Sequence, residues 1–509
     1  MLEASKEYKR GLKQAVDWKL VFCYLFLVLF GWINIYASVH SAEPSSIFDW
    51  SVRSGKQFVW ICTSLLIGAS ILFFVNARVW EVITIPSYIF VGVLLVLVIF
   101  VSKDVKGSHS WFELGPIKFQ PAEISKITTS LLLATIMSKT NFKLTKFKNF
   151  LTVAAIIGIP MLTIVAESET GSALVYLGFI FVMYREGLSG WLLAVAGLCV
   201  LLFILTLTAS PYTSIVVLLA LVAVCYYSQA GVSFKAALAS LGIIVFLAFL
   251  PTLWGLLQGA FVPGYSLIGK VDPSVEGAIL YGAKGKLLLK IQPLHILLVA
   301  CGCTFPLLCA KALWGKNTAL WAALGAFALG VVLVFSTQFL FNDVLEPHQR
   351  ARIEVLLGMK EDLAGVGYNV NQSKIAIGSG GLLGKGFLHG TQTTYGFVPE
   401  QSTDFIFCTV GEEWGFIGCA IVILVYLYMI YRIIVDAEKS RESFTRIYGY
   451  CVASCIFMHL FINIGMTIGL MPVIGIPLPL LSYGGSSLWA FTILIFIFIA
   501  LDREENKYF

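Results

Sequence analysis

Seven carboxylate side chains lie in or beside long apolar stretches, where a charge is costly to bury and usually serves a function. They are Glu123, Glu167, Glu169, Asp362, Asp404, Glu412 and Glu413. Asp362 differs from the rest because it lies in a long segment between apolar stretches, after Arg350 and Arg352 and before Gly365 and Gly367. A carboxylate in such a segment is a candidate general base, which accepts a proton from a reacting group.

Structural explanations compete with chemistry for several of these acids. Glu123 and Lys126 are three residues apart, so on a helix they share a face and can form an ion pair. Glu412 and Glu413 begin an apolar stretch, and we expect them to bond to backbone groups or to a basic partner rather than to catalyse.

Glycine is dense in the segment from Phe341 to Thr403, the longest one without a clear membrane span. Long loops of this kind are usually functional or disordered, and the scarcity of charge runs argues against disorder. The run GSGGLLGKG is not a P-loop, because Lys385 is followed by Gly386 and not by Ser or Thr. Two interpretations stay open: a ligand-binding loop, and a structural re-entrant loop packed among helices.

Composition identifies a membrane protein. Of 509 residues, 58% are hydrophobic and 13% are charged, whereas soluble chains carry about 25% charged residues. Apolar runs of about 20 residues predict 14 transmembrane helices. They lie near 17–39, 57–75, 80–102, 121–138, 150–166, 171–184, 189–208, 212–227, 233–258, 294–315, 318–341, 406–431, 447–471 and 482–501. The first run is too long for a signal peptide and lacks a cleavage site, so it predicts a retained helix.

Lys and Arg are more frequent in the loops on one side of these spans, which predicts that both termini are cytoplasmic. The net charge of +6 fits an anionic leaflet and calls for no nucleic-acid partner. The cysteines fall almost wholly within spans, so structural disulfides are not expected. Cys301 and Cys303 lie in an apolar helix without further ligands, and the histidines lack metalloprotease spacing; no protein metal site is predicted.

Three blocks of sequence resemble a known family. The first joins Trp111 to Gln120-Pro121-Ala122-Glu123 and Lys126. The second is GVGYNVNQSKIAIGSGG, followed by Gly390-Thr391-Gln392, Pro399-Glu400 and Thr403-Asp404. The third runs from Asn463 through Gly469, Pro472 and Gly475 to Ser482-Tyr483-Gly484-Gly485-Ser486-Ser487. Together they resemble the SEDS proteins (shape, elongation, division and sporulation), and the IAIGSGG and GTQ forms favour the RodA branch over the division paralogue FtsW.

The chain departs from the family pattern in places. Glu169-Thr170-Gly171-Ser172 stands where Pro-Asp-Leu-Gly-Thr is usual, His348 replaces a tyrosine, and Leu363 follows Asp362 where proline is common.

The resemblance implies an all-α, polytopic ten-helix core in two parts, 17–190 and 318–501, with a catalytic loop at 342–405 that is extracytoplasmic and partly re-entrant. The remaining four helices form an inserted transmembrane region, 191–317, whose role is open between partner contact and bulk. Cytoplasmic segments, 1–16 and 502–509, flank these parts.

The resemblance implies that Asp362 is the essential loop aspartate, three residues before Gly365-Val366-Gly367-Tyr368. It also implies a peptidoglycan glycosyltransferase of the bacterial inner membrane, which polymerises lipid II on its undecaprenyl carrier during cell elongation and rod-shape maintenance. A class B penicillin-binding protein is the implied partner. A lipid II flippase and a non-catalytic scaffold are the alternatives.

Pyrophosphate, the leaving group, needs cationic stabilisation from a divalent ion (Mg²⁺ or Mn²⁺) or from Lys and Arg. The basic candidates are Lys126, Arg352, Lys374 and Lys385, and Glu123 and Glu169 are expected to line a groove for the lipid. Matched positions in the family blocks add further substrate-binding candidates: Gln372, Ser373, Thr391, Gln392, Glu400 and Asp404.

Overall fold

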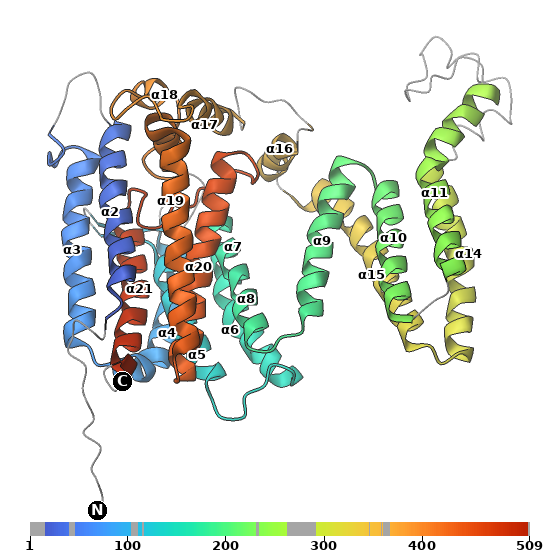
Figure 1. Ribbon diagram of the computed structural model, residues 1–509, viewed down its shortest axis with the longest axis horizontal. Coiled ribbons are helices and arrows are strands. Elements are labelled where there is room, and N and C mark those ends of the chain that lie inside the picture. Colours follow the sequence, from blue (N-terminus) through green and yellow to red (C-terminus); the bar gives the residue numbers. More distant parts are fainter. Residues whose placement is uncertain are drawn as a thin grey trace, which may run out of the picture. The chain divides into compact units, whose positions relative to one another are not determined.

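The computed structural model describes residues 16–39, 46–102, 110–114, 117–230, 234–261, 292–345, 347–357, 359 and 367–506 (Figure 1). The chain forms two compact units. The first comprises residues 1–190 and 361–509, and the second comprises residues 191–360. Asp362, the predicted base, lies outside the described residues.

Long apolar helices build the first unit. They are α2 (Trp18–Val39), α3 (Arg53–Phe74), α4 (Ala77–Val101), α5 (Pro121–Met137), α6 (Phe147–Ala166), α19 (Ile406–Lys439), α20 (Ser443–Thr467) and α21 (Gly485–Asn506). Shorter elements complete it: α7 (Thr170–Val175), η1 (Tyr176–Gly178), α8 (Phe179–Arg185), α17 (Tyr368–Ser379) and α18 (Thr391–Thr394). Strands β1 (Phe112–Leu114) and β2 (Ile117–Phe119) form a small antiparallel hairpin.

Helices α20 and α21 lie at the centre of the first unit. In each, 78% of the apolar window is buried inside the protein, against 22% for α4 and α6, which lie at the periphery. Helix α5 packs against α4, α6, α20 and α21, so it belongs to the centre as well. Polar side chains on these inner helices are therefore removed from both water and lipid, and they need partners within the protein.

The second unit is a smaller group of helices. It contains α9 (Gly190–Thr208), α10 (Pro211–Ala230), α11 (Phe234–Phe261), α14 (Pro293–Trp314), α15 (Thr318–Phe339), the π-helical turn η3 (Leu340–Val344) and α16 (Pro347–Leu356). Helix α10 packs against α11, α14 and α15. A hydrogen bond of 3.0 Å from the Thr206 hydroxyl to the Ser214 hydroxyl joins α9 to α10 across their short connection.

The predicted all-α polytopic fold is confirmed, and each of the 14 predicted segments is helical. Twelve described helices are long and apolar enough to cross a membrane. The count differs from 14 because α5 has only 17 residues and Thr170–Arg185 is a shorter, interrupted helix. The predicted loop 342–405 is also more ordered than a simple loop, since it contains α16, α17 and α18.

Candidate functional site

A buried polar cluster joins α5 to α20 in the first unit. The Lys126 ammonium lies 2.9 Å from Oε1 of Glu123 and 2.8 Å from Nε2 of His459. Nδ1 of His459 lies 3.2 Å from the carbonyl oxygen of Pro477, so Nδ1 donates there and Nε2 accepts from Lys126. The ammonium also lies 5.0 Å from the ring centroid of Phe491, within range of a cation–π interaction.

This cluster confirms the expected ion pair between Glu123 and Lys126. Both side chains are only 2% exposed, so the cluster belongs to the protein interior and not to an open surface. Oε2 of Glu123 is buried without a hydrogen-bond partner in the described structure. His459 was not among the predicted residues; its only sequence signal was a histidine within the apolar stretch 447–471.

A second cluster surrounds the Glu412 carboxylate near the start of α19. Oε1 accepts the backbone N–H groups of Thr391 (2.8 Å) and Gln392 (2.9 Å), and Oε2 accepts the N–H of Thr393 (2.9 Å). The Thr393 hydroxyl adds a further bond to Oε2, and the Lys385 ammonium lies 2.7 Å from Oε1. Glu412 thus caps the first turn of α18 and neutralises Lys385, as expected for an acid that binds backbone and a basic partner.

Steric crowding explains why position 390, the first of the GTQ motif, is a glycine. A Cβ on Gly390 would lie 2.3 Å from the Thr393 hydroxyl oxygen and 3.0 Å from Oε2 of Glu412. Any side chain would therefore push the turn off the carboxylate. The predicted residues Thr391, Gln392 and Lys385 are brought together here, with Glu412 as their common partner.

The glycine-rich run that begins at the end of α17 packs closely on the start of α19. A Cβ on Gly380 would lie 1.9 Å from the carbonyl oxygen of Gly411, and one on Gly384 would lie 2.1 Å from that of Glu413. Gly415, with φ of 64°, interrupts the helical backbone of α19 at this contact. Glycine permits both the positive φ and the close approach of backbones. These contacts give the GSGGLLGKG run a structural role, as in the second interpretation above.

Residues of the third family block, Asn463 and Ser482, hydrogen-bond to the backbone just before α19. The Asn463 amide donates to the carbonyl oxygens of Asp404 (2.8 Å) and Ile476 (2.6 Å). The Ser482 hydroxyl donates to the carbonyl oxygen of Thr403 at 2.6 Å. Asn463 is fully buried, and its two bonds together with that of Ser482 fix residues 403–404 against residues 476–482.

The remaining candidates of the first unit are spread around these clusters. The Ser373 hydroxyl donates to the carbonyl oxygen of Thr467 at 3.0 Å, and Gln372 is half-buried on α17. Glu400 accepts from the Thr403 hydroxyl at 3.3 Å. Glu169 accepts from the Ser110 hydroxyl at 2.7 Å.

Lys374 is the exposed lysine of α17. Its side chain passes over Gly469, where a Cβ would lie 2.3 Å from Cε of Lys374. Arg352, the other exposed candidate, lies on α16 in the second unit. Among the described residues, no three His, Cys, Asp or Glu side chains gather as metal ligands.

Comparison with known proteins decides the family. The sequence model of one family, the FtsW, RodA and SpoVE cell cycle proteins, matches residues 17–223 and 295–507. The chain belongs to this family. The unmatched stretch, 224–294, lies within the region predicted as inserted. As an FtsW/RodA/SpoVE protein with twelve candidate spans, the chain is a multi-pass membrane protein.

Named relatives are similar over most of the chain. A Treponema pallidum protein named peptidoglycan glycosyltransferase RodA is 29% identical over 96% of this chain and 98% of its own length. Escherichia coli peptidoglycan glycosyltransferase MrdB is 29% identical over 81% of this chain and 75% of its own length. A solved structure named "Structural coordination of polymerization and crosslinking by a peptidoglycan synthase complex" shares the fold, with a TM-score of 0.55, 20% identity, and coverage of 96% of this chain and 98% of that one.

Glu412→Gln should loosen the GTQ turn of this SEDS protein. The amide places an N–H₂ donor among backbone N–H donors and removes the charge facing Lys385, at a cost of about 2–4 kcal/mol. We expect faster proteolysis and amide exchange in residues 385–405. Glu438→Gln is the control, because Glu438 lies on the same helix in an exposed ion pair with Arg185. Equal protection of the turn in both variants would contradict the anchoring role.

Glu167 should make stability depend on pH. It is fully buried just after α6, and burial, followed by the charge of Glu169, raises its pKa from 4.5 to about 8. Between about pH 5 and 8, the folded chain therefore holds a proton that the unfolded chain has already released. The free energy of unfolding falls as pH rises through this window, by about 2–4 kcal/mol. Glu167→Gln should flatten the dependence of the melting temperature on pH between 5 and 9. An unchanged slope in that variant would refute this role.

Proposed function

We propose that this chain is a peptidoglycan glycosyltransferase that polymerises lipid II into glycan strands during cell elongation and rod-shape maintenance. The observation that carries the proposal is the similarity, along nearly the whole of both chains, to a protein named peptidoglycan glycosyltransferase RodA. The similarity to a glycosyltransferase of a second organism, Escherichia coli MrdB, also supports the proposal.

In the proposed reaction, Asp362 is the general base. Its carboxylate takes the proton of the acceptor sugar hydroxyl while the oxygen attacks the anomeric carbon of the donor. The new glycosidic bond forms as the bond from that carbon to the pyrophosphate breaks. Because the undecaprenyl pyrophosphate departs as a stable anion, the reaction needs no second carboxyl to protonate the leaving group, as glycoside hydrolysis usually does.

Lys374 is the best supported of the basic candidates for the pyrophosphate. Lys126 is buried in an ion pair, and Lys385 is held by Glu412. Lys374 instead extends from α17 with an exposed side chain over Gly469 of the family signature. A divalent cation, Mg²⁺ or Mn²⁺, is the alternative source of positive charge at the leaving group.

The remaining proposals concern the setting of the reaction. The distribution of Lys and Arg supports an inner-membrane topology with both termini in the cytoplasm and residues 342–405 on the periplasmic side. We also propose a class B penicillin-binding protein as the partner that crosslinks the strands. The similar solved structure is described as a complex that coordinates polymerisation with crosslinking, and this description supports such a partnership.

The test is incubation of the purified, reconstituted chain with labelled lipid II. A ladder of glycan polymers, sensitive to a muramidase, supports the enzyme. Movement of lipid II between leaflets without polymer would favour the flippase. Absence of both activities, with and without the partner, would favour a scaffold.

A further inference from the structure

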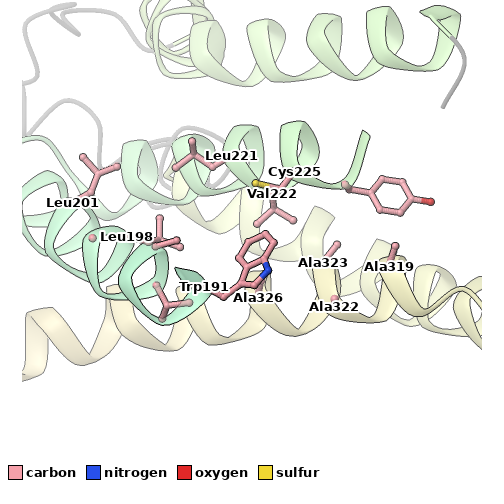
Figure 2. Close-up of a pocket in the computed structure, with 14 residues that line it drawn as sticks. Trp191, Leu198, Leu201, Leu221, Val222, Cys225, Ala319, Ala322, Ala323 and Ala326 are labelled. Atoms are coloured by element: carbon pink, nitrogen blue, oxygen red, sulfur yellow. The ribbon is translucent and has the colours of Figure 1, made fainter. Parts of the chain in front are cut away.

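An apolar groove of about 610 Å³ lies within the second unit, between α9, α10 and α15 (Figure 2). We propose that it holds an acyl chain of one anionic glycerophospholipid, retained by the protein as a bound lipid. All of its lining residues belong to the second unit, and none of them takes part in the proposed reaction.

Small side chains form the floor of the groove. Ala319, Ala322, Ala323 and Ala326 recur at helical spacing, so they lie along one face of α15. Larger side chains form its walls, with Trp191 and Leu198 from α9 and Val222 from α10. Figure 2 shows these side chains arranged around a common space. The result is a lengthwise apolar channel suited to a hydrocarbon chain.

The groove lies at one end of its helices. Its α15 residues follow the α14–α15 turn directly, and its α9 and α10 residues lie away from the turn that joins those two helices. At this end Asn317 donates to the Tyr226 hydroxyl at 3.3 Å, and Tyr226 also lines the groove. Trp and Tyr at a helix end are typical of the membrane interface.

Positive charge marks the same end of the described helices. Lys311 lies in the last turn of α14, Lys316 lies in the α14–α15 turn and Lys235 lies in the first turn of α11; all three are exposed. Residues 191–261 and 292–342 contain no Asp or Glu. An anionic headgroup above the groove would complement these lysines. Under the topology proposed above, that headgroup lies in the cytoplasmic leaflet.

A transmembrane helix of a partner is the competing occupant, because small residues also favour helix packing. A helix with its side chains is about 10–12 Å wide, and it packs best on a broad, open face. The alanine floor here is instead bordered by the bulky side chains of Trp191, Val222 and Tyr226. The lysines add a preference for a phosphate that an apolar helix does not explain.

Photocrosslinking with diazirine-labelled phosphatidylglycerol in nanodiscs tests the site. We expect labelled residues to concentrate in 191–201, 221–226 and 319–326, with at least fivefold less labelling from phosphatidylcholine bearing the same chain. Uniform labelling of all lipid-facing helices, or equal labelling by the two lipids, would overturn the proposal.

Matched variants separate the tail from the headgroup. Ala323→Trp fills the groove and should reduce its labelling at least fivefold. Val332→Trp places the same side chain on an exposed position of α15 outside the groove and should not. The double variant Lys311→Gln/Lys316→Gln should retain labelling but lose the preference for phosphatidylglycerol. Unchanged labelling in Ala323→Trp, or unchanged preference in the lysine variant, would refute the assignment.

A photoreactive residue identifies a protein occupant. Benzoylphenylalanine at Cys225, an exposed position in the groove, should crosslink to lipid in cell membranes. A crosslink to another polypeptide instead would show that a helix occupies the groove. If Ala323→Trp fails to fold, the lipid comparison and the lysine variant still decide the question.

Discussion

Asp362→Asn is expected to abolish polymerisation of lipid II, with a loss of at least about 100-fold, the lower range for a general base. The amide is nearly isosteric but cannot accept the proton of the attacking hydroxyl, so the acceptor stays un-ionised at the transition state. The measurement is the initial rate of glycan formation by purified protein in proteoliposomes, with binding of lipid II measured separately. We expect the rate to fall and the affinity to change little.

Asp343→Asn is the matched control, since Asp343 is an exposed aspartate of the same 342–405 segment. It should polymerise at the rate of the unsubstituted chain. A normal rate for Asp362→Asn, or equal losses in the two variants, would remove Asp362 from the chemistry. So would topology mapping that placed Asp362 in the cytoplasm.

The fold could be predicted because apolar runs of membrane length admit few structures other than helices. Each of the 14 segments predicted from these apolar runs is helical in the structure. The apolar runs did not fix the number of helices long enough to span the membrane, because α5 and Thr170–Arg185 are shorter than the other predicted spans. The β1–β2 hairpin was also missed, since three-residue strands carry little periodic signal.

The candidate site was less predictable, because its contacts join residues that are distant in the chain. The pair of Glu123 and Lys126 follows from helical spacing, and it was found. Their partner His459 is 333 residues away from Lys126 on another helix, and no local pattern connects them. The GTQ motif was singled out by resemblance, but only the structure shows that Glu412 holds it.

Lys126→Met should strongly destabilise the first unit. It removes the ammonium from between Glu123 and His459, and it leaves a carboxylate that is 2% exposed without its cation. Breaking a buried ion pair from one side costs about 3–5 kcal/mol. The measurement is the free energy of unfolding in mixed micelles. Lys148→Met, at an exposed position, is the control and should change it by less than about 0.5 kcal/mol.

The double variant Glu123→Gln/Lys126→Met distinguishes a structural pair from a substrate-binding one. Replacing both charges removes the uncompensated carboxylate, so stability should recover by half or more of the loss. If the folded double variant polymerises lipid II, the pair serves the packing of α5 against α20. If it folds but makes no glycan, Lys126 or Glu123 meets the substrate in a state that opens the cluster. A Lys126→Met variant as stable as the unsubstituted chain would contradict the buried geometry itself.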